Sequence, residues 1–386
     1  MSQWKKVKLK DICLSISDGD HLPPPKTDHG IPFITISNID STNHLDFSNT
    51  LFVPQEYYDN VDEKRKAKAG DILYSVVGSF GKPVLIMENK PFAFQRHIAI
   101  LRPDNDIVDS AFMYYAMMTC NFYMQADSVA LGAAQRTISL GSLRDMTIEM
   151  PTKDVQQRIA NILSKYDSLI ENYQQQIKLL EETAQRLYKE WFVDLHFPGY
   201  ENTKIVDGVP EGWEFLQLID CYIFQYGKIL ATKNLIKDGK YPVYGASKVI
   251  GYYNKANCFN PVVLIGSRGN AGYVHRTIEQ YSYVTNNSFI VKPKRNHEFM
   301  GLPFIYESFL CMDFKSICTG AAQPQLTLSS LASMKYLLPD LSLIKNYCLK
   351  AQPSFDRISN IFMQLRLLTE ARDRLLPKLM SGEIEV

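Results

Sequence analysis

The chain has 386 residues, which is more than one average domain needs and suits two or three domains. Hydrophobic residues make up 46% of it and aromatic residues 12%, a composition that provides for buried cores and excludes a disordered chain. The formal net charge of +1 excludes a protein that coats nucleic acid through bulk positive charge, so any contact with nucleic acid must come from local patches and shaped loops.

The seven cysteines are odd in number and include no CxxC pair, which argues against a disulfide framework or a zinc knuckle and fits a reducing compartment. The basic N-terminal segment is not followed by the apolar stretch of a signal peptide, and no apolar run approaches the length that crosses a bilayer. We therefore expect a cytoplasmic protein without a membrane segment.

Short runs of β-branched and aromatic residues, bounded by Gly, Pro and Asn, predict strands in the first part of the chain. These strands lie at residues 32–36, 71–77 and 98–101, and a short helix is expected at 109–123. The pattern indicates a mixed α+β globule of about 150 residues or somewhat fewer, which is a normal domain size.

A long helix is predicted next, because residues 154–191 contain neither Gly nor Pro. Apolar or small residues recur there at alternating intervals of four and three, a heptad pattern that keeps one narrow stripe facing a partner helix. At about 1.5 Å per residue this helix spans roughly 50 Å, which is too long for the inside of one small domain. The residues of the stripe are Ile159, Leu163, Tyr166, Ile170, Tyr173, Ile177, Leu180, Ala184, Leu187 and Trp191.

The remainder of the chain repeats this order of elements. Strands are predicted at residues 241–244, 262–265 and 289–291, and the partner of the short helix is expected at 308–316. A second heptad stripe follows near the end of the chain and consists of Tyr347, Ala351, Ser354, Ile358, Ile361, Leu365, Leu368, Arg372, Leu375 and Leu379.

The second stripe is less clean than the first. Its members Ser354 and Arg372 are polar, and Pro353 predicts a break or a late start of the helix. One interpretation is that each stripe packs against some unspecified surface. We favour antiparallel pairing of the two long helices, because it matches two stripes within one chain and leaves neither exposed.

The two halves are a duplication, since matching residues lie 188 positions apart in two loops and in both long helices. The start of each half matches at a different offset of 209, so the first half carries 21 extra residues (209 − 188), which we place around residues 21–60. The matching segments are Gly78-Ser79-x-Gly81 with Gly266-Ser267-x-Gly269, Gly132-Ala133-Ala134-Gln135 with Gly320-Ala321-Ala322-Gln323, Leu187 with Leu375, and Trp4, Leu9 and Asp11 with Trp213, Leu218 and Asp220.

These features together resemble the specificity subunits of bacterial type I restriction–modification systems over essentially the whole chain. One departure is that the second helix begins Leu343-Ile344-Lys345-Asn346 where the first begins Gln156-Gln157-Arg158-Ile159, which leaves open whether its first turn contacts partners in the same way. The segments that carry the resemblance by their order and duplication are Asp18-Gly19-Asp20-His21 with Gly30-Ile31-Pro32-Phe33-Ile34, Lys240-Tyr241-Pro242-Val243-Tyr244-Gly245-Ala246 with Ile250-Gly251-Tyr252-Tyr253, Gly70-Asp71-Ile72-Leu73, the Gly-Ala-Ala-Gln loop of each half, Gln156-Gln157-Arg158-Ile159-Ala160, and Leu379-Met380-Ser381-Gly382-Glu383-Ile384.

The pattern and the resemblance imply an α+β fold with two homologous mixed α/β target-recognition domains. Two long antiparallel helices separate these domains, form a coiled-coil spacer and give the chain a pseudo-twofold symmetry. The implied division is a first recognition domain at 1–152, a central helix at 153–197, a second recognition domain at 198–339 and a C-terminal helix at 340–386.

The resemblance further implies a non-catalytic subunit that binds a bipartite site on double-stranded DNA, one half per recognition domain, with the halves about one helical turn apart. The implied partners are two adenine-N6 methyltransferase subunits, bound along the helices, and the translocase/nuclease subunits of the restricting complex. No cofactor is expected in this chain, because S-adenosylmethionine, ATP and magnesium belong to the partner subunits.

Base readout requires side chains with paired donors and acceptors, and phosphate contact requires positive charge, backbone N–H groups or small hydroxyls. Candidate loops in each half supply both kinds of group. The candidate DNA-binding residues are His21, Lys26, Ser79, Lys82, Gln95, Arg96 and Arg136 in the first half and Lys228, Arg268, Asn270, Asn286, Asn287 and Gln323 in the second.

Each candidate has a structural alternative that the sequence leaves open. The glycine loops at 78–81 and 266–272 are equally typical of plain hairpin turns. Gln135 and Gln323 are as well suited to bind buried backbone groups, and Arg96 to an internal ion pair. The basic run at 64–68 is typical of a solvated face, and a phosphate contact there stays open.

Catalysis is disfavoured by the motifs. A methyltransferase would carry an N/DPP[YF] motif, which Asn260-Pro261-Val262-Val263 does not match, and the GxGxxG and GxxxxGK[ST] loops are absent. A nuclease site from Asp71, Glu88 and Lys90 is not preserved in the second half, and the histidines lack the spacing of metal ligands. A scaffold that only dimerises is a third interpretation, which the two complete globules disfavour.

Overall fold

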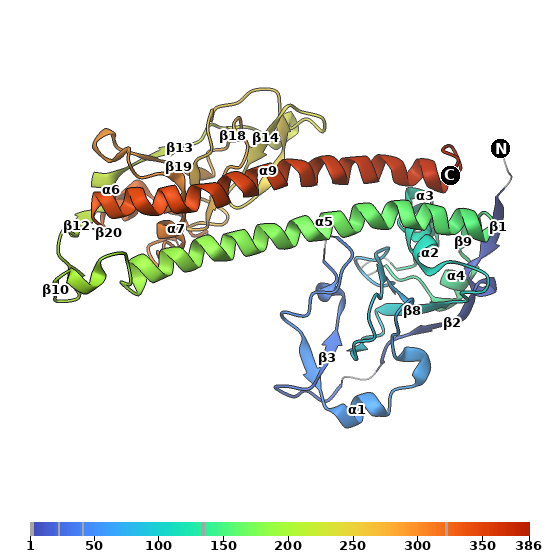
Figure 1. Ribbon diagram of the computed structural model, residues 1–386. Coiled ribbons are helices and arrows are strands. Elements are labelled where there is room, and N and C mark those ends of the chain that lie inside the picture. Colours follow the sequence, from blue (N-terminus) through green and yellow to red (C-terminus); the bar gives the residue numbers. More distant parts are fainter. Residues whose placement is uncertain (1–3, 22–23, 41, 133–135, 321–322) are drawn as a thin grey trace. The chain divides into compact units, whose positions relative to one another are not determined.

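The computed structural model describes residues 4–386 apart from 22–23, 41, 133–135 and 321–322. It contains two compact units (Figure 1). Unit 1 comprises residues 1–171 and 367–386, and unit 2 comprises residues 172–366. The boundary falls within two long helices, α5 (Lys153–Tyr188) and α9 (Leu341–Met380), so each unit holds one globular part and a portion of both helices.

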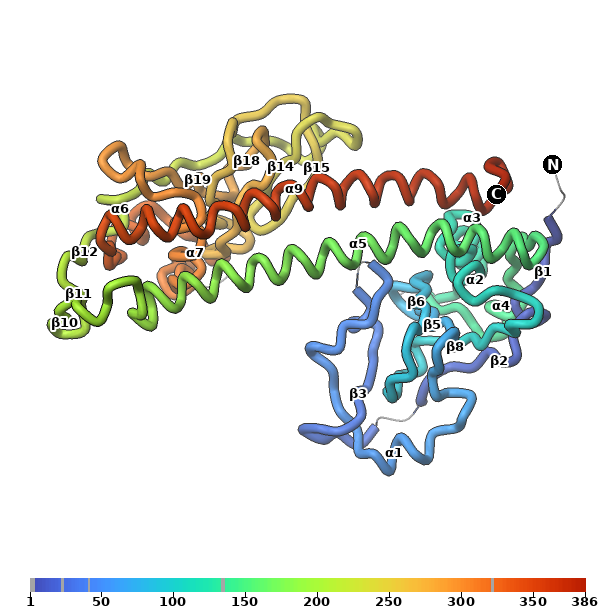
Figure 2. Tube along the Cα trace, viewed as in Figure 1, coloured from blue at the N-terminus to red at the C-terminus, as the bar shows by residue number. Residues whose placement is uncertain are grey.

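The globular part of unit 1 combines short strands with four short helices. Its strands are β1 (Lys5–Lys8), β2 (Cys13–Asp18), β3 (Ile31–Ile34), β4 (Leu51–Val53), β5 (Ile72–Ser75), β6 (Pro83–Leu85), β7 (Ala93–Phe94), β8 (Ile98–Pro103) and β9 (Thr147–Met150). Its helices are α1 (Gln55–Asp59), α2 (Ser110–Met117), α3 (Cys120–Val129) and α4 (Leu140–Asp145). Both ends of the described chain belong to this unit (Figure 2).

The globular part of unit 2 has the same kind of composition. Its strands are β10 (Ile205–Val206), β11 (Val209–Pro210), β12 (Glu214–Gln217), β13 (Tyr222–Tyr226), β14 (Tyr241–Tyr244), β15 (Val249–Tyr253), β16 (Val263–Gly266), β17 (Val274–Arg276), β18 (Tyr283–Val284), β19 (Ser288–Pro293) and β20 (Lys335–Leu338). Its helices are α6 (Leu218–Cys221), α7 (Leu302–Leu310) and α8 (Leu328–Ala332), and a π-helical turn (Lys189–Val193) follows α5.

The two units share their strand order and strand directions, which confirms the duplication. An antiparallel sheet has the order β2-β8-β5-β6 in unit 1 and β13-β19-β16-β17 in unit 2. A smaller sheet has the orders β4-β3-β7 and β15-β14-β18, in which β7 and β18 run parallel to their neighbours. The pairs β1-β9 and β12-β20 then join a strand near the start of each globular part to its last strand.

The predicted match of Gly78 with Gly266 is wrong by three residues. Gly266 occupies the position of Ser75, since each of these carbonyls accepts the hydrogen bond that closes the following turn, from Gly272 (2.8 Å) and Gly81 (3.0 Å) respectively. The counterpart of Gly78 is therefore Gly269, and both have a left-handed φ (66° and 79°). Glycine recurs every third residue at 266, 269 and 272, so the sequence alone offers two equally good registers.

The short helices also depart from the sequence prediction. The segment at 109–123 forms two helices, because the side chain of Thr119 caps a new helix by accepting a hydrogen bond from the backbone of Phe122. The helix predicted at 308–316 is wrong, since α7 begins six residues earlier, where Pro303 follows Gly301 at the helix start. Asp313 then accepts backbone hydrogen bonds in a turn that prevents a helix there.

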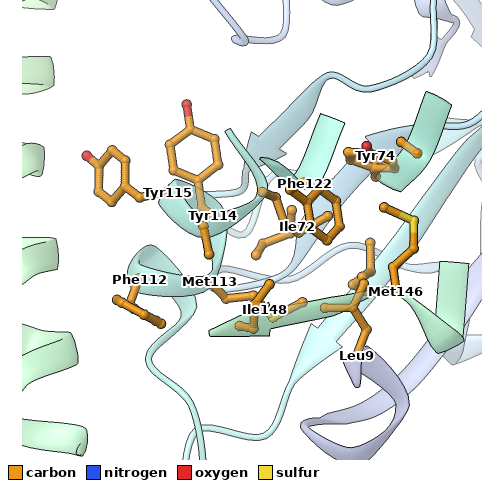
Figure 3. Close-up of a cluster of buried hydrophobic side chains, with 14 of the residues drawn as sticks. Leu9, Ile72, Tyr74, Phe112, Met113, Tyr114, Tyr115, Phe122, Met146 and Ile148 are labelled. Carbon is orange, nitrogen blue, oxygen red and sulfur yellow. The ribbon is translucent and has the colours of Figure 1, made fainter. Parts of the chain in front are cut away.

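The core of unit 1 joins its globular part to both long helices. Figure 3 shows the centre of this cluster, in which β5, α2, α3 and β9 contribute buried side chains such as Ile72, Phe112 and Ile148. Tyr74 and Phe122 make an edge-to-face ring contact at 5.7 Å. The same cluster includes Ile159 and Leu163 of α5 and Leu379 of α9. The main core of the globular part is therefore continuous with the helices, whereas two smaller buried clusters, around Leu73 and around Phe33, contain no residue of α5 or α9.

The core of unit 2 is aromatic where the helices meet the globular part. Tyr188 and Phe192, at the end of α5, contact Phe304 of α7 at 5.9 and 5.2 Å between ring centroids. Tyr347 of α9 contacts the same two rings at 5.8 and 5.4 Å, and its hydroxyl donates to the carbonyl of Ala184 at 3.2 Å. These rings fix both helices against α7, since aromatic clusters of this kind bury large apolar areas.

The predicted stripes face each other in both units, which confirms the antiparallel pairing of α5 with α9. Every stripe residue of both helices is buried or half-buried, whereas most neighbouring positions are exposed. In unit 1, Asp167 contacts Arg372, and in unit 2, Ala184 contacts Tyr347. A residue that comes later in α5 therefore meets one that comes earlier in α9.

The expected break at Pro353 is wrong, because α9 is continuous from Leu341 to Met380. Proline lacks an N–H, so the carbonyl of Leu349 loses its helical hydrogen bond. Leu349 is 74% exposed and Pro353 also lies on the exposed side, so water can bind that carbonyl. The helix tolerates the proline because the lost partner does not lie in the stripe.

The polar stripe residue Arg372 forms an ion pair within the protein. Its guanidinium pairs with Asp167 at 2.8 Å, both side chains are 18% exposed, and the hydroxyl of Tyr115 donates to the same carboxylate at 2.6 Å. Removing one partner of a poorly hydrated pair leaves the other charge without compensation. We therefore expect Arg372→Met to lower the free energy of unfolding by about 2 kcal/mol.

Chemical denaturation followed by circular dichroism measures this loss. The double variant with Asp167→Asn should recover most of it, since an amide is neutral and still accepts the bond from Tyr115. A matched control is Arg374→Met, which removes a largely exposed ion pair with Glu370 and should cost less than about 0.5 kcal/mol. Equal losses from the two arginine variants would contradict the stabilising role of the pair.

Unit 2 contains a buried carboxyl group that makes the stability of the folded protein depend on pH. Glu307 of α7 is 3% exposed, one of its carboxyl oxygens has no recorded partner among the described residues, and burial raises its pKa to about 7 although the nearby Arg276 lowers it. The unfolded chain loses this proton near the ordinary value of 4.5. The stabilising contribution is therefore complete below pH 4.5 and is lost as the pH rises through 7.

We expect the free energy of unfolding to fall by roughly 2–3 kcal/mol from this group alone between pH 4.5 and 8. Glu307→Gln should remove that component of the pH profile, since its amide stays neutral. Guanidinium denaturation at several pH values, with the exposed Glu298→Gln as control, measures the difference. An unchanged profile for Glu307→Gln would show that the carboxyl is hydrated in the folded protein.

Candidate nucleic-acid interface

Three loops of unit 1 are joined by backbone hydrogen bonds at one end of its sheets. After β2, the N–H of Asp20 donates to Phe94 (2.9 Å), and the carbonyl of Asp20 accepts from Arg96 (2.9 Å). The carbonyl of His97, one residue further, accepts from Val76 (2.9 Å) beside the glycine turn between β5 and β6. The loops that follow three different strands therefore form one connected surface.

A further segment joins this surface at the glycine turn. The N–H of Gly78 donates to the carbonyl of Arg136 at 3.0 Å, and Val77 forms a bridge with Thr137. We call the connected residues 19–21, 76–82, 95–97 and 136–137 the loop edge of unit 1. The predicted residue Gln135, between Ala134 and Arg136, lies outside the residues that the structure describes.

Unit 2 repeats these bonds position by position. Lys228 donates to Val284 (3.0 Å) and accepts from Asn286 (3.2 Å), and the carbonyl of Asn287 accepts from Ser267 (2.7 Å) beside the second glycine turn. The remaining bridge joins Arg268 to Gln325, as Val77 is joined to Thr137. We call residues 227–229, 267–273, 285–287 and 323–325 the loop edge of unit 2.

One glycine in each unit makes this connection possible. A Cβ at Gly19 would lie 2.2 Å from the carbonyl oxygen of Phe94, and a Cβ at Gly227 would lie 2.3 Å from that of Thr285. No side chain fits at such a distance, so the crossing of the two loops requires glycine. The geometry of both loop edges is thereby set by the main chain.

The candidate side chains in unit 1 differ in whether they already have a partner within the protein or could bind a ligand. His21 is bound to Asp18 at 2.7 Å, and the ammonium of Lys82 donates to the carbonyls of Ile39 and Asp40 at 3.4 and 3.2 Å. Arg96 is exposed, and no ion pair is recorded for it among the described residues. The alternative of an internal ion pair for Arg96 is therefore not supported, whereas His21 and Lys82 have internal partners.

Arg136 is the most constrained of these cations. It pairs with the carboxylate of Asp127 at 2.5 Å and donates to the carbonyl of the same residue, and its guanidinium lies over the ring of Phe80 at 5.3 Å. Gln95 is half-buried at its bridge with Asp20, and Ser79 is exposed at the turn. Contact of Arg136 with a ligand would compete with its aspartate partner.

The loop edge of unit 2 presents more uncommitted donors. Lys228, Arg268, Asn270, Asn287 and Gln323 are exposed, and none of the two cations has a recorded carboxylate partner in the described part of the chain. Asn286 is half-buried at its bond to Lys228. Exposed arginine and asparagine side chains on a fixed backbone suit paired hydrogen bonding to base edges.

Two candidate groups lie away from the loop edges or are neutralised. Lys26 is exposed but falls outside the loop edge of unit 1. In the basic run at 64–68, Lys66 and Lys68 both pair with Glu63, at 2.9 and 3.4 Å. Two of the four cations of that run therefore share the neighbouring carboxylate of Glu63, as expected of a solvated face.

Asp71, the carboxylate considered for a nuclease site, has a structural role. Asp71 is 3% exposed and receives two hydrogen bonds from Arg102, at 3.0 and 2.8 Å, so it does not form a nuclease site with Glu88. Burial raises the pKa of the Cys13 thiol to about 12, which keeps it from acting as a thiolate. Within the described ranges no group of three acidic, histidine or cysteine residues could hold a metal ion, and no helix there is long and apolar enough to cross a bilayer.

Sequence reasoning missed one residue of the loop edges. Ile229 follows Lys228 and is 81% exposed, the largest value among the large hydrophobic side chains that the structure describes. The signal that could have found it is the structural match of the halves, which places Ile229 where unit 1 has His21. The sequence match alone did not extend through this segment, because the extra residues of the first half follow it directly.

Comparison with known proteins gives a consistent result. The chain matches the model of the type I restriction modification DNA specificity domain over residues 1–182 and again over residues 210–366. It is 24% identical over 310 residues to the type I restriction enzyme MjaIX specificity subunit of Methanocaldococcus jannaschii, covering 73% of this chain and 70% of the relative. It is also 24% identical over 482 residues to the type I restriction enzyme HindI specificity subunit of Haemophilus influenzae, covering the whole of both chains.

A solved structure has the same fold. The S subunit of a type I restriction–modification system from M. genitalium superposes with a TM-score of 0.63 at 21% identity. The match covers 97% of this chain and 96% of that one. At this level of identity the similarity concerns the arrangement of the elements and not the side chains of the loop edges.

Proposed function

Since the chain belongs to the family of the type I restriction modification DNA specificity domain, we propose that its two loop edges read the two halves of one bipartite DNA site. The chain is a specificity subunit, and its role in the system is recognition rather than catalysis. The two matched regions of the family model correspond to two recognition domains in one polypeptide.

The observation that carries the proposal is that one pattern of backbone hydrogen bonds presents different side chains in the two units. The exposed Arg96 of unit 1 stands where unit 2 has the half-buried Asn286, and the buried Val77 stands where unit 2 has the exposed Arg268. A shared main chain that carries different side chains is what two related readers of different sequences require.

The roles of the candidates follow from their availability. Arg96, Arg268, Asn270, Asn286 and Asn287 are proposed to read base edges, since arginine pairs with guanine and asparagine with adenine. The remaining candidates are cations, one hydroxyl, one imidazole and two glutamine amides, which suit positioning on phosphates, a contact that carries no sequence information. The residues proposed for that role are His21, Lys26, Ser79, Lys82, Gln95, Arg136, Lys228 and Gln323.

The proposed partners are those of the family. We propose that residues 153–197 and 340–386 form a spacer and bind two adenine-N6 methyltransferase subunits, while residues 1–152 and 198–339 are the recognition parts. Translocase/nuclease subunits would complete a restricting complex. S-adenosylmethionine, ATP and magnesium would be bound by these partners and not by this chain.

Methylation sequencing of a host that carries the chain together with its methyltransferase partner tests the proposal. The expected result is one split motif with a methylated adenine on each strand, which disappears when the chain is omitted. Methylation that persists without the chain, or no methylation in either case, would contradict a reading function and favour a scaffold.

Point substitutions then assign the readers. Arg268→Ala should weaken binding of the reconstituted complex to its own site by about tenfold or more, and binding to random DNA much less, because a base contact is lost. Arg96→Ala should do the same for the other half of the motif. Competition binding assays at fixed salt measure both ratios.

The matched control is Arg295→Ala, which removes an exposed cation of unit 2 that lies outside its loop edge. It should leave the ratio of specific to random binding unchanged. If Arg268→Ala and Arg295→Ala weaken both kinds of DNA equally, Arg268 contacts phosphates only and the proposed assignment to base readout fails.

A further inference from the structure

The side chain of Ile229 stands out among the groups on the loop edge of unit 2. It is 81% exposed, and it follows Lys228 at the point where the segment after β13 crosses the segment before β19. The neighbouring groups at this edge are cations and amides, including Arg268 and Asn287. Single exposed aliphatic side chains are common on protein surfaces, and this one is distinguished by its place among the polar groups of the loop edge.

The main chain around Ile229 is held from both sides. The hydroxyl of Tyr283 donates to the carbonyl of Ile229 at 3.2 Å, and Lys228 is bonded in both directions to the facing segment. A β-branched side chain has few rotamers. The aliphatic group is therefore presented in a defined place, and ordering it on a ligand would cost little conformational entropy.

Unit 1 offers a direct contrast at the same position. There the residue is His21, a polar side chain whose ring nitrogen lies 2.7 Å from the carboxylate of Asp18. The surrounding backbone hydrogen bonds are the same in the two units. The two units therefore differ here in the side chain, imidazole or aliphatic, and not in the backbone. Such a change is expected at a position that selects between ligands rather than one that maintains the fold.

We infer that Ile229 is a specificity-determining residue that packs against the C5-methyl group of a thymine in the half-site read by unit 2. Among the base edges of the major groove, this methyl is the apolar group, and the other groups there are hydrogen-bond donors and acceptors. The polar neighbours of Ile229 suit those other groups. This inference rests on the proposed function. It adds an apolar contact to the thymine methyl, which none of the polar candidates can make.

Removal of the methyl group itself gives the sharpest test. Each recognised thymine of the mapped motif is replaced in turn by deoxyuridine, which keeps the hydrogen-bonding groups and lacks the methyl. The complex with its methyltransferase subunits should bind about three- to tenfold more weakly when one particular thymine is replaced, as expected for one buried methyl-sized contact. Replacement of thymines outside the recognised bases should have no effect.

The variant Ile229→Ala completes the cycle. It should bind thymine-containing DNA with the affinity that the unmodified protein has for the deoxyuridine site, and it should no longer distinguish the two DNAs. Ile229→Val should retain most of the discrimination, because a branched aliphatic group remains. The control is Ile223→Ala, the loss of a 48% exposed isoleucine of β13 outside the loop edge, which should change neither affinity nor discrimination.

Several outcomes would overturn the inference without touching the proposed function. They are a mapped motif that contains no thymine among its recognised bases, equal binding of thymine and deoxyuridine at every position, and full methyl discrimination by Ile229→Ala. The absence of any split motif in the methylation map would instead remove the proposed function, and with it the basis of the inference.

Discussion

The apolar stripes of α5 and α9 cover each other within each unit, and both globular parts depend on this pairing because their cores continue into it. Ile159 and Leu163 of α5 and Leu379 of α9 belong to the same buried cluster as the sheet of unit 1. Tyr188 and Tyr347 have the corresponding position in unit 2. Removing the helices would expose the main core of each globular part and leave only its smaller clusters, so recognition and spacing depend on the same folding.

Different interactions hold α5 against α9 in the two units. In unit 1 a charged residue within the stripe is compensated by the pair of Arg372 with Asp167 and by the hydroxyl of Tyr115. In unit 2 the helices are fixed by a cluster of aromatic rings around Phe304. Charge pairs select one register strongly because a shift leaves a buried charge alone, whereas aromatic packing contributes more through buried area.

The main features of the fold could be predicted because they depend on patterns that tertiary structure reinforces. Spacing of four and three predicted the helices, and the repeat of glycine loops predicted the duplication. What failed depended on local chemistry that the pattern does not weigh. Pro353 did not break α9, because the carbonyl of Leu349, which loses its helical partner, lies near solvent. The glycines at every third position of 266–272 allowed two alignments of the halves, and only the backbone hydrogen bonds distinguish them.

The candidate site was predicted only in part for a related reason. The types of residue at the loops indicated which could bind DNA. Whether Arg136 or Lys82 is free depends on partners that the sequence does not identify, which are Asp127 for Arg136 and the carbonyls of residues 39–40 for Lys82. Ile229 was missed because an isolated aliphatic residue in a loop carries no motif. Its environment became visible only when the two units were matched bond by bond.

The crossings at Gly19 and Gly227 bear on how proteins of this kind can diverge. Since the glycine main chain sets the approach of the two loops, exposed flanking side chains without a recorded ion-pair partner, such as Arg96 and Arg268, are not needed for it. Mutation or recombination can therefore alter them at little cost in stability, and descendants of the gene can explore new sequence preferences while inheriting the same architecture.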